Sequence, residues 1–305
     1  MKSIESKVVI TIDTEVRTRN RDLPDPYLQD VLGHLSGGDR GTFWITEELE
    51  KHGFAGVFFL DVYGSVKYGA DRYRALCDRL LAGGHSIQLH THPDQMYEAT
   101  QRHMHEYSLV QQTGIIRDGM DLLKDWTGTS PTSHRAGRYG ANEDTLRALH
   151  ANGIYLDSSF FYGRGDCKLP FANTNAPFQS HGIWEIPVTV AAEPLEKLGY
   201  RFPFWTRHFW RHYQKLDVNC MPDWQLCRSV SEASGKVPYI ITFLHSFSFT
   251  RREPGGGFVP DLPAIASFQA LLEYLAQKGM PVVTFEQVAA ELAAQTQQPL
   301  GGKTS

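Results

Sequence analysis

The chain has 305 residues, with 30 lysines and arginines against 34 aspartates and glutamates, and a formal net charge of −4. This balance gives no positive field that would attract nucleic acid or an anionic bilayer. Hydrophobic and charged contents of 41% and 21% are typical of a globular protein. The four cysteines include no Cys-x-x-Cys pair, so neither a thiolate zinc site nor a disulfide framework is indicated.

The N-terminal residues lack the uninterrupted apolar core of a signal peptide, and no segment approaches the roughly 20 apolar residues of a membrane span. We therefore expect a cytoplasmic protein, with a peripheral position at the inner membrane face as the alternative. No repeat or convincing linker divides the chain. We predict one domain over residues 1–294 and a polar, disordered tail over 295–305.

Apolar runs and helical patterns alternate along the chain, with short connections between them. This alternation predicts an α/β fold with a parallel sheet or barrel and helices outside it. A polar segment at 16–41, with Pro24, Pro26 and several glycines, is expected to be an irregular insertion. Strands are expected at 8–12, 56–60, 85–92, 133–136, 154–159, 184–190, 239–244 and 281–285, and helices at 42–52, 70–82, 97–126, 142–153, 264–279 and 286–294.

Two acids, Asp13 and Glu15, stand two residues apart at the end of the first strand. Acids in this position often mark only a strand that reaches solvent. The functional alternative is that one carboxylate binds a metal ion while the other stays free as a base.

Two histidines, His90 and His92, close the strand at 85–92, and Pro93 stops it. Residues two apart on a strand point to the same side, so both imidazoles face one point. Neutral imidazole is a common ligand of zinc and similar ions. Two surface histidines at a strand exit are the alternative. A second pair, His103 and His105, falls in a predicted helix, where residues two apart do not share a face, and is interpreted as surface.

Arg135 and His245 also follow predicted strands, so four strand ends carry charged or ionisable residues. In parallel β/α barrels, the C-terminal ends of the strands form one rim, and active sites assemble there from distant segments. A structural ion pair for Arg135 and a buried core histidine for His245 are the alternatives.

In their order, these segments resemble the polysaccharide deacetylase superfamily (NodB-homology, carbohydrate esterase family 4-like). The segment 11–15 (TIDTE) is similar to the first motif and 84–92 (GHSIQLHTH) to the second. The segments 135–137 (RAG) and 244–246 (LHS) are similar to the third and last. The resemblance covers most of the chain and implies a single-domain, distorted (β/α)7 TIM-like barrel.

The resemblance also implies roles for these residues. Asp13 is expected to be the catalytic base, Arg135 to hold that base, and His245 to act as the acid. Glu15 and His90 are expected to bind one divalent metal, with zinc first and cobalt, nickel, manganese or iron as alternatives.

The second motif departs from the usual pattern, in which the histidines stand four residues apart. The usual spacing would place the other ligand at Asp94, whereas His92 is the nearer imidazole here. We rank His92 above Asp94 as the third ligand.

The third and fourth motifs also differ from the usual pattern. The third is normally Arg-x-Pro-Tyr, with the tyrosine amide at the oxyanion; here Gly137 occupies the turn and Tyr139 is shifted by one position. The fourth contributes an aspartate and a tryptophan that orient the acid histidine. Asp223 and Trp224 precede His245 at a suitable separation.

The expected activity is metal-dependent N-deacetylation of an acetamido sugar rather than cleavage of a peptide bond. The expected substrate is a glycan, lipid-linked or nucleotide-sugar precursor of a surface polysaccharide of the O-antigen type. A deformylase or amidase acting on another C–N bond, and a barrel that binds glycan without turnover, are the alternatives. The aromatic and basic segment 200–213 is interpreted as a sugar-stacking platform, a membrane or oligomer contact, or a helix packed on the barrel.

Overall fold

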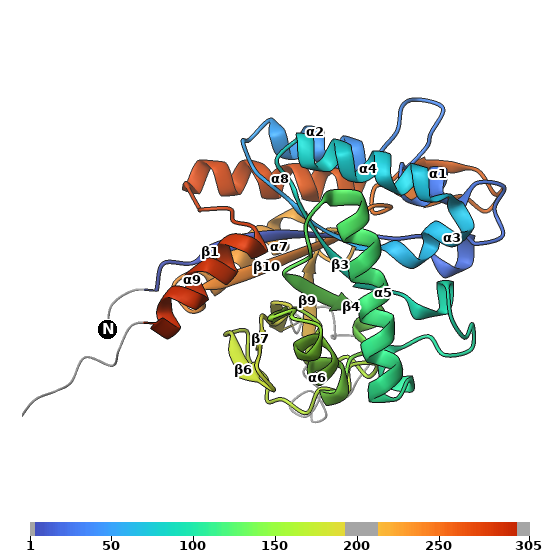
Figure 1. The fold of residues 1–305 in the computed structure, drawn as a ribbon. Helices are drawn as coiled ribbons and strands as arrows, with labels where there is room; N and C mark the ends of the chain where they lie inside the picture. The colour runs from blue at the N-terminus through green and yellow to red at the C-terminus, as the bar shows by residue number, and fades with distance from the viewer. Residues whose placement is uncertain (1–3, 193–212, 298–305) are drawn as a thin grey trace, which may run out of the picture.

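The computed structural model describes residues 4–192 and 213–297. Its centre is a curled sheet of ten strands in the order β6-β7-β5-β4-β3-β2-β1-β10-β9-β8 (Figure 1). Pairing is parallel from β7 through β9 and antiparallel at the two ends of the sheet. The strands are β1 (Lys7–Thr14), β2 (Val57–Asp61), β3 (Ser86–Thr91), β4 (Ser133–Ala136), β5 (Leu156–Asp157), β6 (Phe178–Ser180), β7 (Ile183–Glu185), β8 (Val190–Ala192), β9 (Tyr213–Asp217) and β10 (Tyr239–His245).

Helices cover the outside of this sheet (Figure 1), with α2, α4 and α8 along one side of it. A small hairpin of β11 (Thr250–Arg252) and β12 (Phe258–Pro260) follows β10. The helices are α1 (Pro26–Asp30), α2 (Thr42–Glu50), α3 (Ser65–Tyr68), α4 (Ala70–Ala82), α5 (Leu109–Thr127), α6 (Glu143–Ala151), α7 (Asp223–Ala233), α8 (Leu262–Lys278) and α9 (Phe285–Gln297).

The two sides of β1 have different partners because successive side chains of a strand point in opposite directions. Val8, Ile10 and Ile12 lie in the large core that also contains side chains of α4, α5 and α8. Val9 lies in a second core, which α9 completes. Asp13 follows Val9 at even spacing, so the pleat directs this acid to the inner side of the sheet.

The strand register then brings the predicted residues to one rim. Asp13 of β1 is the register partner of His245 of β10. His90 of β3 is the register partner of Arg135 of β4. Residues far apart in the sequence therefore become neighbours at the C-terminal ends of parallel strands.

The predicted α/β class and distorted, barrel-like sheet are confirmed, but several element boundaries were wrong. The helix expected at 97–126 begins only at Leu109, because the preceding chain forms a loop with a short 3-10 turn at Met104–Glu106. The strand expected at 281–285 is reduced to a single bridge from Val282 to Val8. The strand expected at 184–190 is broken between β7 and β8, around Pro187.

Helix α9 ends at Gln297, past the predicted boundary at residue 294, and residues 298–305 lie outside the described chain. The segment 200–213 lies outside it too, except for Tyr213 at the start of β9. None of the helices described here is both long enough and apolar enough to span a bilayer.

Candidate active site

Glu15, His90 and His92 converge at the rim. One ligand atom from each lies within 4.8 Å of the others, in a group that could bind a metal ion. His90 Nε2 is 3.1 Å from Glu15 Oε2, and His92 Nε2 contacts the same oxygen. One carboxylate and two imidazoles are a donor set suited to zinc and related ions.

The hydrogen bonds of the two imidazoles fit this interpretation. His90 Nδ1 donates to the Arg135 carbonyl oxygen at 2.8 Å, which turns Nε2 toward Glu15. His92 is only 5% exposed; its Nε2 lies against Glu15 Oε2, and its Nδ1 has no hydrogen-bond partner in the described chain. A buried imidazole whose close polar neighbour is a carboxylate fits a metal ligand.

Gly137 makes room for the His92 ring. A Cβ atom built on Gly137 would lie 2.7 Å from His92 Nε2 and 2.5 Å from the Thr91 carbonyl oxygen. Any larger residue here would push the imidazole or the end of β3. The turn after β4 therefore fixes the position of the second histidine.

Asp94, the alternative ligand, is placed differently. Its Oδ2 accepts a hydrogen bond from Arg21 Nη1 at 2.7 Å, and its Oδ1 is 3.9 Å from His92 Nδ1, away from the nitrogen that faces Glu15. Asp94 is not part of the three-residue group. This arrangement favours His92 over Asp94 as the third metal ligand.

Asp13 lies beside this group but is bound to an arginine. Arg135 Nη1 donates to Asp13 Oδ1 at 2.8 Å, while Asp13 Oδ2 lies 3.7 Å from His90 Nε2. Burial raises the pKa of Asp13, but the charges of Arg135 and His90 outweigh burial and lower it overall. The carboxylate is therefore ionised, and one of its oxygens faces the candidate metal ligands.

Arg135 is fully buried, and its guanidinium donates to four groups besides packing on an aromatic ring. Nη1 also donates to Thr11 Oγ1 at 3.0 Å, and Nε and Nη2 donate to Ser158 O and Oγ at 3.0 and 3.1 Å. The guanidinium carbon lies 4.2 Å from the centroid of the Phe59 ring. These contacts fix the guanidinium and, through it, Asp13.

His245 lies on the other side of Glu15, with Nε2 3.9 Å from Glu15 Oε1. Its ring stacks on Phe247 at 4.4 Å between centroids. Burial away from water, together with the positive charge of Lys215, lowers the pKa of His245 to about 4. The imidazole is therefore neutral at pH 7.

Asp223 and Trp224 are the residues that the resemblance predicts to orient His245. They begin α7 on the surface, where Trp224 is 55% exposed and Asp223 Oδ1 accepts a hydrogen bond from the Trp224 amide. Within the described chain, no interaction links either residue to His245. The acids whose charges act on His245 are Glu15, Asp13 and, at the end of β9, Asp217.

The sequence interpretation missed Lys215 and Asp217. Lys215 Nζ lies 3.2 Å from Asp217 Oδ2, donates to the Tyr139 hydroxyl at 3.1 Å, and lies over the Phe243 ring. Alternating charged residues in the segment YQKLD at 213–217 were the available signal. Its apolar content is low, so the segment was not recognised as a strand.

Asp61 was missed as well. It ends β2 and is the register partner of His90. Burial raises the pKa of Asp61 to about 6, although the charges of His92 and His90 oppose this increase. Its position after a predicted strand could have identified it.

Tyr139 is buried and packs against Phe161 and Phe243. Its backbone has φ 61° and that of the preceding Arg138 has φ 56°, both in the left-handed region that non-glycine residues rarely occupy. Two adjacent residues in this conformation, directly after Gly137, mark the turn as strained. Such strain is common at binding and catalytic sites.

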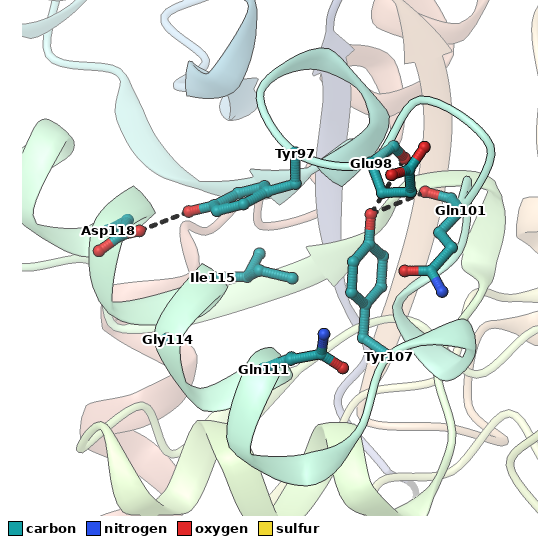
Figure 2. Close-up of a pocket in the computed structure, with 8 residues that line it drawn as sticks. All are labelled: Tyr97, Glu98, Gln101, Tyr107, Gln111, Gly114, Ile115 and Asp118. Atoms are coloured by element: carbon teal, nitrogen blue, oxygen red, sulfur yellow. Dashed lines mark hydrogen bonds between the residues drawn. The ribbon is translucent and has the colours of Figure 1, made fainter.

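Two cavities are lined in part by the loop before α5. One, of about 350 Å³, includes Glu15 and His92 in its wall. The other, of about 370 Å³, lies between Tyr97, Tyr107 and the first turns of α5 and includes none of the candidate metal ligands (Figure 2). The first cavity is therefore the one that leads to the rim. His103 and His105 stack on each other in the loop before α5, 5.0 Å between centroids, and are not part of the metal group.

No protein-family model and no curated protein matches this sequence. Among solved structures, a provisionally named polysaccharide deacetylase from Mycobacterium smegmatis aligns with 100% of this chain and 96% of its own, at 16% identity and a TM-score of 0.62. Puue allantoinase aligns with 98% of this chain and 93% of its own, at 14% identity and a TM-score of 0.57. A family 4 carbohydrate esterase from Streptomyces lividans, solved with acetate, aligns with 92% and 93% at 13% identity and a TM-score of 0.48.

At these identities, similarity of structure establishes the fold and no more. The strand-end motifs had predicted that fold from the sequence. The chain thus shares the fold of the Mycobacterium smegmatis protein and of Puue allantoinase.

Proposed function

We propose that this protein is a metal-dependent hydrolase that removes the N-acetyl group from an acetamido sugar. The observation that carries the proposal is the convergence of Glu15, His90 and His92 beside an ionised Asp13 that is not one of the three. The proposed substrates are glycan, lipid-linked or nucleotide-sugar precursors of a surface polysaccharide of the O-antigen type. Zinc is the proposed metal.

Glu15, His90 and His92 are the proposed ligands, and the convergence of both imidazoles on one carboxylate oxygen fits that role. A divalent ion supplies Lewis acidity, which polarises an acyl oxygen and lowers the pKa of a water from roughly 15.7 to about 7. Asp13 Oδ2 takes the proton of the attacking water. Arg135 binds the other oxygen of Asp13 and keeps the carboxylate ionised and oriented.

His245 delivers a proton to the leaving amine. Because its pKa is lowered to about 4, the imidazole is neutral in the resting protein and must first acquire that proton during the cycle. Asp13 and His245 are register partners across β1 and β10, so both face the same small space. The backbone at Gly137 and Tyr139 is the proposed donor to the oxyanion.

The names of the similar structures agree with hydrolysis of a C–N bond. The Mycobacterium smegmatis protein is named for polysaccharide deacetylation. Allantoinase is named for a substrate that is not a sugar, which supports an amidase or deformylase as the second candidate. Comparing release of acetate with release of formate or ammonia distinguishes these activities.

The test is acetate release from N-acetylated sugars by the zinc-loaded protein. Asp13→Asn should lower kcat by about 10²–10⁴-fold because the base is lost, while bound zinc stays near one equivalent. His92→Ala should lose the metal together with the activity. Arg74→Met, which breaks a surface pair with Asp125, is the matched control and should equal wild type. Equal rates in Asp13→Asn and wild type would reject the mechanism.

A further inference from the structure

The cavity beside the candidate metal ligands has an unusual charge. Its wall contains Glu15, His92 and four arginines, which are Arg17, Arg19, Arg102 and Arg138. These arginines come from the insertion after β1, the loop before α5 and the turn after β4. Three separate segments thus bring guanidinium groups to a single cavity of about 350 Å³.

Only one of the four arginines is neutralised by an acid. Arg17 pairs with Asp30 at 2.6 Å and lies over the Phe247 ring. Within residues 4–192 and 213–297, Arg19, Arg102 and Arg138 form no ion pair with a carboxylate. Three arginines without a carboxylate partner therefore line one cavity, and guanidinium groups match the geometry of carboxylate and phosphate anions.

Arg138 gives the most specific indication. It is half-buried, and its Nη2 donates to Thr18 Oγ1, but its Nη1 is buried and has no partner in the described structure. A buried cationic donor without an acceptor is unfavourable, and so is the left-handed backbone of this residue. An anion in the cavity would supply the missing acceptor.

Arg102 is presented by a fixed loop. Its amide donates to Glu106 Oε2 at 2.5 Å. The Tyr107 hydroxyl bonds the carbonyl oxygens of Glu98 and Gln101, at 3.2 and 3.0 Å, and so ties down the residues just before it (Figure 2). A preorganised loop loses little entropy when a ligand binds.

We propose that this cavity binds the phosphate or diphosphate of a substrate in which the acetamido sugar is phosphate-linked. This rests on the proposed function and selects a phosphate-linked sugar over a neutral polymer. A phosphate carries up to two charges and several acceptor oxygens, which guanidinium forks match in geometry. Because Glu15 and His92 share the wall with the arginines, the acyl group and the phosphate would occupy adjacent parts of one cavity.

The first test is binding of inorganic pyrophosphate to the metal-free protein, measured by calorimetry at constant ionic strength. Arg138→Met and Arg102→Met should each weaken binding about tenfold or more, because each removes a charge-assisted hydrogen bond. Arg74→Met removes the same charge elsewhere and should bind as wild type. Equal affinity in Arg138→Met, Arg102→Met and wild type would overturn the proposal, as would glucuronate binding as tightly as pyrophosphate.

The second test compares substrates of the zinc-loaded enzyme. N-acetylglucosamine 1-phosphate should have a kcat/KM at least about tenfold above that of N-acetylglucosamine. This ratio should fall in Arg138→Met and not in Arg74→Met. Two further substrates, a uridine diphosphate sugar and a prenyl diphosphate sugar, tell whether the phosphate comes from a nucleotide or a lipid. A preference for neutral chito-oligosaccharides would overturn the proposal.

The two proposals can fail separately. Pyrophosphate binding that depends on Arg138, without acetate release from any substrate, would reject the hydrolase and leave the anion site. Acetate release without anion binding would reject the anion site and leave the hydrolase.

Discussion

Two arginines lie three residues apart in two parts of the rim. Arg135 is in β4, beside the candidate metal ligands and Asp13, and Arg138 is in the turn after β4, in the wall of the arginine-lined cavity. Arg135 is fully buried, and all three of its guanidinium nitrogens donate hydrogen bonds within the protein. Arg138 is half-buried, occupies a left-handed conformation, and retains a buried nitrogen without a partner in the described chain. Every guanidinium nitrogen of Arg135 thus has a hydrogen-bond partner within the protein, whereas one guanidinium nitrogen of Arg138 has none in the described chain.

This difference indicates a positioning role for Arg135 and a ligand-binding role for Arg138. Arg135 uses four of its five guanidinium donors within the fold, so it orients Asp13 and does not need to touch substrate. An arginine with a free donor in a cavity wall costs stability until a ligand arrives. Proteins commonly accept this loss of stability at functional sites.

Stability measurements should show the largest contrast. Arg135→Met leaves the buried Asp13 carboxylate unpaired, and loss of one partner of a buried ion pair typically costs about 3–5 kcal/mol. Arg138→Met removes an unpaired cation and should change the free energy of unfolding by about 1 kcal/mol or less. Urea unfolding of the two metal-free variants measures both values.

The double variant Arg135→Met/Asp13→Asn is the control, since it removes the unpaired carboxylate and should recover part of the lost stability. A loss of stability for Arg138→Met as large as that for Arg135→Met would contradict the comparison. It would mean that the second arginine is also part of the fold.

Much of the first part of this rim could be predicted from the sequence. Asp13, His90 and Arg135 each follow an apolar strand, so the two-residue period and the parallel sheet place them together. A polar residue at the end of an apolar strand is visible in the local sequence, and the parallel sheet then brings these residues together at one rim. Glu15 and His92 follow from the same spacing.

The other site residues and the arginine-lined cavity could not be predicted, because their positions depend on contacts between segments far apart in the sequence. Lys215 comes from a short strand with little apolar content, and it lies beside Tyr139 because β9 pairs with β10. Asp223 and Trp224 were placed near His245 by motif order alone, whereas the helix α7 begins on the surface. The arginine-lined cavity is formed by three loops, where neither strand nor helix periodicity applies.

Gly137 lies between Arg135 and Arg138, in the turn that supports His92, and a substitution here should have a smaller effect. Gly137→Ala would place a methyl group 2.7 Å from His92 Nε2, so the imidazole must move. We expect zinc affinity to fall by about 10–100-fold, the usual effect of disturbing the support of a ligand. Competition with a fluorescent chelator measures the affinity. Gly114→Ala on α5, where the added carbon meets nothing within 4 Å, is the control.

The smallest expected effect is on the protonation of His245. Its pKa of about 4 results first from burial and then from the positive charge of Lys215. Lys215→Met removes the charge and leaves the burial, so the imidazolium becomes less unfavourable and the pKa should rise while staying below the usual 6.5. Proton NMR titration of the metal-free protein, with His245→Gln for assignment, gives the value. A pKa that stays at 4 or falls would show that Lys215 is not charged in the folded protein, and that burial alone keeps this histidine neutral.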